Sequence, residues 1–359
     1  MPKELKEILE LAVNAPSGHN SQPWKFVVKG EKLFIWNIPD KDQILFNYKQ
    51  RGSLVAHGAL IENIYIAASK FGYEVGSIIL PVKSEQDLIA ELSFAPKKAD
   101  YPYQDLSDSI LKRKTNRKPF KIVTLKNEDR DAIGKFINSS TSLREHVVFT
   151  EDRGLIGNVA ASFSIGDRLL FENTHIHSDL FRNVNWTLEE EEERREGLYV
   201  MTKELSLLNR IIFKNIISKW HILSRLEKIK FPVKAAEKRA KLYQQCSAMG
   251  MITADRDSET DFVESGRLVQ RFWLMATSLG LSYQPVSIGL LYLGQWCEKE
   301  NPKKLTENQV ALVKDAYAKI LESFNIKNQT PIFSFRVGYS TPPTFSSLKK
   351  KPNISYDTA

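Results

Sequence analysis

Two segments that lie far apart in this chain share a pattern that limits how it can fold. Residues 58–73 align without a gap with residues 266–281. Both segments are apolar on most faces, as a buried central helix is, and each ends at a glycine suited to a left-handed C-cap. A short predicted strand follows each helix, at 75–80 and at 282–286. The identical positions are Gly58, Leu60, Ala68 and Gly72 in the first segment and Gly266, Leu268, Ala276 and Gly280 in the second.

Duplication of one α+β unit explains this echo most economically, although two unrelated buried helices could also match this well. We therefore predict an α+β fold made of two pseudo-symmetric halves. The first half is expected at residues 1–105 and the second at residues 106–359. The second half is expected to carry a helical insertion at about 175–231.

Composition excludes several classes of protein. The chain has 359 residues, of which 42% are hydrophobic and 26% charged, enough for one large core or two ordinary ones. Cys246 and Cys297 are far apart, so neither a disulfide framework nor a zinc site is expected. No stretch approaches the roughly 18 apolar residues of a membrane span, and residues 1–10 alternate in charge. We expect a cytoplasmic protein with no integral membrane segment.

The net charge of +8 favours anionic partners, which include nucleic acid, membrane surfaces and phosphorylated cofactors. No nucleic-acid-binding motif is visible, so nucleic acid is not an expected partner. The distribution of the charge is therefore more informative than its size.

A polar loop lies between a predicted helix at 5–13 and a predicted strand at 25–28. Prolines at both ends fix φ and lack an N–H, and the glycine permits a positive φ. The amides and hydroxyls between them are free to face a polar heterocycle. A capped turn, with Trp24 as a core anchor, is the alternative. The loop contains Pro16, Ser17, Gly18, His19, Asn20, Ser21, Gln22 and Pro23 and closes on Trp24.

A basic cluster follows a helix predicted at 106–111. Five cations occur within residues 112–118, and they repel one another unless an anion is near. Guanidinium groups at Arg113 and Arg117 suit phosphate oxygens, and Thr115 adds a hydroxyl donor. Lys114 adds a further positive charge. The alternative is a solvated basic turn, which is what such runs usually form.

Both segments resemble parts of the FMN-dependent nitroreductase family. The loop resembles that family's Pro-Ser-x-x-Asn-x-Gln-Pro-Trp segment, which cradles the isoalloxazine ring and ribityl chain of FMN. The cluster resembles the Arg-Arg-Ser-x-Arg segment that begins an ordinary member, with Lys114 for arginine and Thr115 for serine as departures. The resemblance implies central antiparallel or mixed sheets flanked by helices.

An ordinary member carries both segments in each subunit, and its homodimer builds two flavin sites. Here the first half has only the loop and the second half has only the cluster. This arrangement resembles the fused, Acg-type branch of the family, in which one chain imitates the homodimer. We expect one FMN per chain, a degenerate second site, and either a monomeric pseudo-dimer or a homodimer.

The resemblance also implies roles for individual residues. Arg113 and Lys350 are expected at the phosphate, Thr115, Ser17 and Asn20 at the ribityl chain and ring, and Arg117 near N1 and O2 of the flavin. His19 faces either the ring or solvent, and Gln22 steadies the loop. No catalytic acid, nucleophile or metal ligand is assigned. The predicted cofactor-binding residues are Pro16, Ser17, His19, Asn20, Gln22, Arg113, Lys114, Thr115, Arg117, Pro285, Val286, Ser287 and Lys350.

The expected function is NAD(P)H-dependent reduction of nitroaromatic, quinone or related small molecules, with the chemistry carried by the flavin. The alternative is an FMN-sequestering protein whose site is blocked by the insertion. His175, His177 and Asp179 lack the further ligands of a metal site. The basic, amphipathic stretch 205–229 is interpreted as a lid or partner-facing helix pair, with an anionic membrane surface as the alternative.

Overall fold

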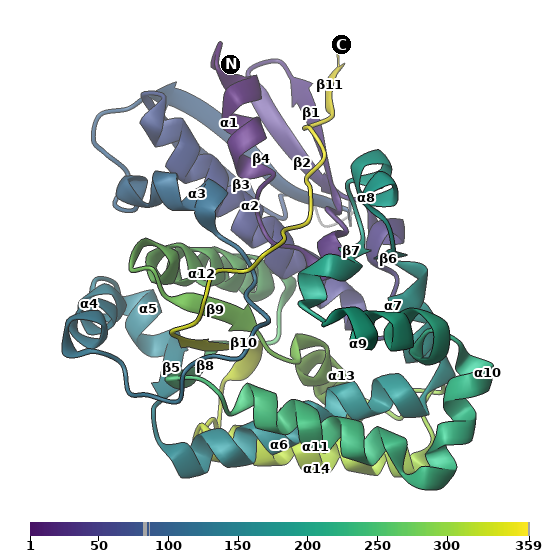
Figure 1. Cartoon of the computed structure of the whole chain (residues 1–359). Coiled ribbons are helices and arrows are strands. Elements are labelled where there is room, and N and C mark those ends of the chain that lie inside the picture. Colours follow the sequence, from purple (N-terminus) through teal and green to yellow (C-terminus); the bar gives the residue numbers. More distant parts are fainter. Residues whose placement is uncertain (82–84, 86, 358–359) are drawn as a thin grey trace.

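The computed structural model describes residues 1–81, 85 and 87–357 (Figure 1). The first half contains helices α1 (Leu5–Ala12) and α2 (Arg51–Lys70) and strands β1 (Trp24–Lys29), β2 (Lys32–Asn37), β3 (Tyr73–Ile79) and β4 (Leu88–Pro96). These strands form a sheet in the order β11-β1-β2-β4-β3, in which β1 to β4 pair antiparallel. Strand β11 (Ile354–Asp357) comes from the C-terminus and pairs parallel with β1, with Phe26 opposite Ile354.

A second sheet repeats this plan. Strands β5 (Val147–Thr150), β8 (Ala248–Ala254), β10 (Thr330–Gly338) and β9 (Ser282–Pro285) lie in that order and pair antiparallel. Helix α12 (Glu259–Ser278) follows β8 and precedes β9, just as α2 follows β2 and precedes β3. The predicted α+β fold, with two sheets flanked by helices, is confirmed.

The second half is larger because helices are inserted at two points. Helices α13 (Ile288–Lys299) and α14 (Glu307–Ser323) separate β9 from β10. The longer insertion separates β5 from β8, whereas β1 and β2 are joined by a tight turn. The predicted insertion at 175–231 is the middle part of this segment. The whole segment between β5 and β8 contains α6 (Arg153–Glu172), α7 (Thr174–Arg182), β6 (Val184–Asn185), α8 (Leu188–Arg194), β7 (Leu198–Tyr199), α9 (Leu207–Ile212), α10 (Trp220–Leu223) and α11 (Phe231–Tyr243).

Shorter elements lie between the two halves and in the loops within each half. The predicted helix at 106–111 is a 3₁₀ turn at Gln104–Asp108 followed by the single-turn helix α3 (Ser109–Lys112). Aspartate and serine in this segment favour turns over helix interiors because their side chains compete for backbone hydrogen bonds. Helices α4 (Asn127–Asn138) and α5 (Thr141–His146) lead into β5. Further short turns lie at Gly18–Asn20, Pro39–Asp42, Tyr48–Gln50, Val200–Lys203, Phe213–Ile217 and Ser224–Ile229.

Helices α2 and α12 pack against each other where the two halves meet (Figure 1). A Cβ at Gly58 would lie 1.9 Å from the carbonyl oxygen of Val263, and a Cβ at Gly266 would lie 2.2 Å from that of Val55. The aligned glycines of the sequence echo are therefore partners at one helix crossing. A side chain at either position has no room.

Buried polar contacts join the same two helices. The Gln270 side-chain amide donates to Asn63 Oδ1 at 2.7 Å. Glu62 pairs with Arg267 at 3.0 Å and with Arg271 at 2.8 Å. Although burial alone would raise the pKa of Glu62, the charges of Arg271 and Arg267 hold it below its usual value. The interface is thus fixed in register as well as in distance.

The C-terminal tail ties the halves together. It leaves β10 in the second half and runs back to the first sheet, where β11 ends the chain (Figure 1). The predicted division into halves near residue 105 stays a prediction. Strand β11 belongs to the second half in sequence but to the first sheet in space. No helix in the described part of the chain is both long and apolar enough to cross a lipid bilayer.

Candidate functional site

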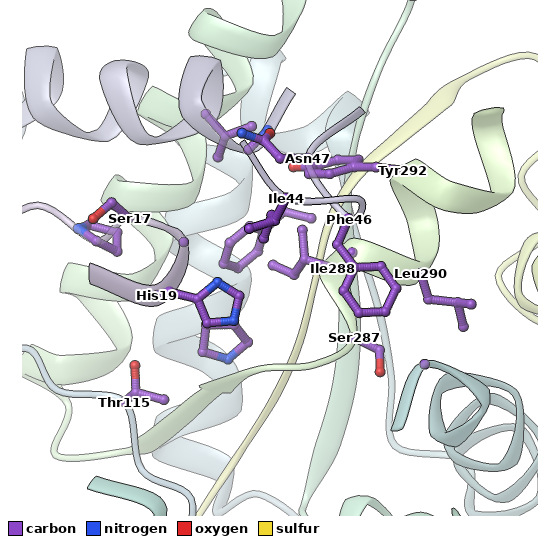
Figure 2. Close-up of a pocket in the computed structure, with 18 of the residues that line it drawn as sticks. Ser17, His19, Ile44, Phe46, Asn47, Thr115, Ser287, Ile288, Leu290 and Tyr292 are labelled. Carbon is purple, nitrogen blue, oxygen red and sulfur yellow. The ribbon is translucent and has the colours of Figure 1, made fainter. Parts of the chain in front are cut away.

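A large cavity of about 380 Å³ lies between the two halves (Figure 2). The loop before β1, the segment 42–47 and the start of α2 form the wall from the first half. Residues of α12, the turn after β9 and the basic cluster form the wall from the second half, and the insertion closes part of it. Insertion residues in the wall are Gly166, Asp167, Leu180, Leu198, Lys203 and Tyr243.

A smaller, more polar cavity of about 170 Å³ adjoins the large one. Arg113 and Lys349 both line it, and both are partly buried. The Arg113 guanidinium donates to the Asn14 carbonyl at 2.9 Å and packs over the Trp273 ring at 4.4 Å. The Lys349 ammonium donates to the Ala15 carbonyl at 2.8 Å. The two cavities share Pro16, Ser17, His19, Thr115, Arg117 and Leu198.

These two cations form no ion pair in the described part of the chain, although the charge of Glu191 offsets part of the charge of Lys349. Burial lowers the pKa of Arg113 to about 10, and burial together with Arg113 holds the pKa of Lys349 well below its usual value. Like charges that are partly withdrawn from water destabilise each other unless an anion lies between them. The small cavity therefore has the chemistry of an anion site.

The loop before β1 has an unusual backbone. His19, Asn20 and Gln22 all have a left-handed φ, at 48°, 58° and 48°. Such values are uncommon outside glycine and persist where surrounding contacts enforce them. The Gln22 N–H donates to Ser17 Oγ at 3.0 Å. The loop is thus held in one conformation, and its backbone sets the directions in which its polar side chains point.

The insertion and the tail supply the remaining anchors of this loop. Gln22 donates from its side-chain amide to the Arg195 carbonyl at 2.6 Å and accepts the Lys350 N–H at 2.9 Å. Asn20 donates to the Leu348 carbonyl at 2.9 Å. Gln22 is buried and lies outside both cavities, which is the position that steadying the loop requires.

His19 projects from the loop into the large cavity (Figure 2). Burial, with the nearby charges of Lys203 and Arg117, lowers its pKa to about 4, so the imidazole is neutral at pH 7. His19 Nδ1 and Asn20 Oδ1 are both buried and have no hydrogen-bond partner among the described residues. Buried polar atoms are normally paired, so these two atoms are suited to a polar ligand.

A cluster of cations lies beside His19. Arg117 donates to the Thr202 carbonyl at 3.1 Å, and burial, together with the charge of Arg239, lowers its pKa to about 10. Burial, Arg239 and Arg117 lower the pKa of Lys203 to about 7. Asp167 compensates only part of this charge, because it pairs with Arg239 at 3.1 Å and accepts the Tyr243 hydroxyl at 2.7 Å. This wall of the cavity can stabilise negative charge on a ligand.

A buried carboxyl group faces the loop from the opposite side. A Cβ on Gly18 would lie 3.0 Å from Asp42 Oδ2. Burial raises the pKa of Asp42 to about 7. Asn47 fixes the surrounding backbone by donating to the Asp42 carbonyl at 2.9 Å and accepting the Gly52 N–H at 2.7 Å. Near neutral pH this carboxyl group can be either a donor or an acceptor.

Most of the residues predicted from the sequence meet at these cavities. Ser17, His19, Thr115 and Ser287 are among those in the large one (Figure 2). Those in the large cavity are Pro16, Ser17, His19, Thr115, Arg117, Pro285 and Ser287, and those only in the small cavity are Asn20, Arg113 and Lys114. Gln22, Val286 and Lys350 line neither.

The structure corrects the positions of Val286 and Lys350. Val286 is fully buried and its N–H donates to the Ser334 carbonyl at 3.0 Å, so this amide is not available to a ligand. Lys350 pairs with Glu196 at 2.6 Å, and Lys349 lies at the small cavity instead. Neighbouring side chains of an extended tail point to different sides, which separates the two lysines.

Several lining residues carry no signal in the sequence. Asp42, Phe46, Asn47, Tyr292 and Lys203 reach the large cavity from segments without a recognisable motif. The polar pair Asp42 and Asn47, with four residues between them, is the one sequence signal for this segment, and such a spacing is too common to predict a binding site. Within the described residues no group of three or more potential metal ligands occurs, so no metal centre is assigned.

Comparison with known proteins shows which proteins this chain is similar to. A nitroreductase-family model matches residues 2–34, the segment that includes the loop. The protein Acg of Mycobacterium tuberculosis, named as a candidate NAD(P)H nitroreductase, is 25% identical over 185 residues, or 49% of this chain and 53% of the relative. The chain is therefore similar to nitroreductases, and the match to the family model lies in its N-terminal segment.

The chain is also similar to a protein of uncharacterized function and, at low identity, to solved structures. An uncharacterized M. tuberculosis protein is 24% identical over 294 residues, which is 81% of this chain and 40% of that protein. The chain spans about half the length of the curated relatives it matches. Iodotyrosine deiodinase, solved with FMN and 3-iodo-L-tyrosine, is 14% identical with a TM-score of 0.37, and the match covers 71% of this chain and all of that one.

Proposed function

We propose that this chain binds one FMN in the joined cavities and is an NAD(P)H-dependent oxidoreductase for small nitroaromatic, quinone or related acceptors. One observation carries the proposal. A large, mainly apolar cavity opens into a small polar one that ends at two cations, which form no ion pair among the described residues. FMN has the same asymmetry, with a flat ring at one end and a phosphate at the other. Bound FMN supplies two-electron hydride chemistry on its ring.

The residues present fit this cofactor. Arg113 and Lys349 would hold the phosphate, since charge-assisted hydrogen bonds to phosphate are strong. Thr115, Ser17 and Asn20 lie along the small cavity and provide hydroxyl and amide groups for the hydroxylated chain. The unpaired atoms of His19 and Asn20 gain partners in this arrangement.

The charge of the large cavity suits a reduced flavin. Arg117 and Lys203 line its wall, and the carboxylate of Asp167 is already shared by Arg239 and Tyr243. The wall therefore has an excess of positive charge, which stabilises an anionic ring. His19 is neutral and does not add to it.

Reduction of a second molecule is favoured over storage of FMN. Leu180, Leu198 and Lys203 of the insertion cover part of the large cavity, as a storage protein would require. However, a further cavity of about 160 Å³ adjoins it at His19, Phe46 and Lys203. This space gives a small acceptor a position beside the flavin. A location in the cytoplasm and a monomeric pseudo-dimer remain predictions.

Cofactor binding is tested by titrating the purified protein with FMN and following the quenching of flavin fluorescence. Arg113→Met and Lys349→Met should each weaken binding roughly ten- to a hundred-fold, because each removes a charge-assisted hydrogen bond of about 1.5–3 kcal/mol. Lys351→Met is the matched control. Lys351 is exposed, and its substitution removes the same charge from the same tail. This variant should therefore bind FMN normally.

Activity is tested by mixing the FMN-loaded protein with NADH or NADPH without oxygen. Loss of the oxidised flavin absorbance, and its return when a quinone or nitroaromatic compound is added, is expected for a reductase. Flavin that stays oxidised would support the storage alternative. Failure of the protein to take up any FMN would refute both.

A further inference from the structure

We propose that the third cavity binds a single-ring aromatic carboxylate, with Lys203 as its counter-ion, and that this defines the acceptor class of the enzyme. The proposal rests on the proposed flavin site next to it. The cavity lies between the insertion and the first half of the chain. Its lining comprises His19, Ile44, Leu45, Phe46, Asp167, Leu170, Ile176, Asp179, Leu180 and Lys203.

The position of this cavity suits a second substrate. It shares His19, Ile44, Phe46, Asp167, Leu180 and Lys203 with the large cavity, so the two spaces are continuous. A molecule in the third cavity therefore lies beside whatever occupies the large one. The insertion forms one wall of this compartment, with Ile176, Leu180 and Lys203 among its lining residues.

The size and apolar surface of the cavity favour a single ring. Its volume of about 160 Å³ is close to the roughly 150 Å³ of an engineered apolar cavity that binds benzene. Ile44, Phe46, Ile176 and Leu180 provide aliphatic and aromatic walls. A fused two-ring molecule would need the neighbouring space as well.

The charges of the wall indicate which polar group the ring carries. Asp179 accepts the Leu45 N–H at 2.8 Å and lies 4.0 Å from Arg182. Asp167 is shared by Arg239 and Tyr243. Both carboxylates therefore have partners.

Lys203 differs from these two acids. Its ammonium forms no hydrogen bond or ion pair among the described residues, and its one polar contact there is with the face of the Phe213 ring at 5.3 Å. Arg117 and Arg239 add further positive charge nearby, which the carboxylate of Asp167 offsets only in part. The depressed pKa of Lys203, about 7, is the expected consequence of a cation in such surroundings. A carboxylate would supply the missing partner, whereas a neutral group would leave the ammonium unpaired.

The experiment uses FMN-loaded protein and two probes of nearly equal shape, benzoate and benzamide. Binding is measured by the change in flavin absorbance and by calorimetry. Benzoate should bind roughly ten-fold more tightly than benzamide, the ratio expected for one charge-assisted hydrogen bond. Lys203→Met should abolish this preference and leave benzamide binding unchanged, measured on protein saturated with FMN because Lys203 also lines the large cavity. Lys214→Met, an exposed lysine on the same insertion, is the matched control and should keep the preference.

A second variant tests the cavity itself. Leu170→Trp fills the space without removing charge and lies outside the large cavity, so it should weaken both probes while FMN remains bound. The proposal is overturned if benzoate and benzamide bind equally to the wild-type protein or if Lys203→Met keeps the preference. Protein that never takes up FMN refutes the proposed function instead, and this is measured first on the same sample.

Discussion

The crossing of α2 and α12 gives the sharpest stability prediction. Gly58→Ala places a Cβ 1.9 Å from the Val263 carbonyl oxygen and 2.8 Å from Gly266 Cα. Real Cβ atoms essentially never approach other heavy atoms within 3.0 Å, so the contact with the oxygen falls short by 3.0 − 1.9 = 1.1 Å. Both obstacles are backbone atoms, which cannot rotate away. The helices must therefore separate or shift by about 1 Å.

Two opposing terms set the size of the effect. Overpacking of a well-packed interior typically costs 1–3 kcal/mol and occasionally more, and a rigid backbone obstacle places this site at about 3 kcal/mol or above. Replacement of a helical glycine by alanine returns about 1 kcal/mol through helix propensity. We expect Gly58→Ala to lower the free energy of unfolding by about 2 kcal/mol or more.

Urea unfolding followed by tryptophan fluorescence measures this change. Gly134→Ala in α4 and Gly157→Ala in α6 are matched controls, since both are helical glycines with nothing within 4 Å of an added Cβ. They should raise stability by about 0.5–1 kcal/mol. If Gly58→Ala is as stable as these controls, the helices do not cross as described. Weaker FMN binding is also expected, because α2 and α12 both line the large cavity.

Two further predictions concern pH and capping. Asp42 has a folded pKa of about 7 against 3.8 in the unfolded chain, so the folded state binds more protons between these values and stability falls as pH rises through them. Asp42→Asn should flatten this decline, which amounts to about 2.5 kcal/mol between pH 5 and pH 8, in urea titrations at these two pH values. An unchanged pH profile would show that Asp42 is not buried as an acid. Thr306 caps α14 in a capping box with Gln309; Thr306→Ala should cost about 1 kcal/mol, and no shift of the urea midpoint would argue against the cap.

Contiguous motifs made half of the site predictable from the sequence. Residues 16–22 and 113–117 are short runs whose chemistry can be recognised without knowing the fold. The echo between the segments at 58 and 266 also predicted the duplicated plan, because a glycine required at a helix crossing leaves a mark in both copies. These signals lie within short segments, so they can be recognised in the sequence without knowing the tertiary structure.

The remaining residues are fixed by tertiary contacts and leave no such mark. Asp42, Phe46 and Asn47 belong to a segment that is ordered by packing against the start of α2. The choice between Lys349 and Lys350 depends on the register of the tail. That register is set where Ile354 pairs with Phe26, and no feature of the lysines themselves reveals it.

The insertion shows most clearly why a family pattern alone misjudges this chain. Judged by the pattern, residues 175–231 are an addition that covers the site, faces a partner or lies on a membrane surface. In the structure, Arg195 holds Gln22, Glu191 accepts the Leu348 N–H at 2.6 Å and Glu196 pairs with Lys350. The insertion therefore fixes the loop and the tail that supply the anion site. Removing it would expose the cavity and at the same time release the groups that make the cavity specific.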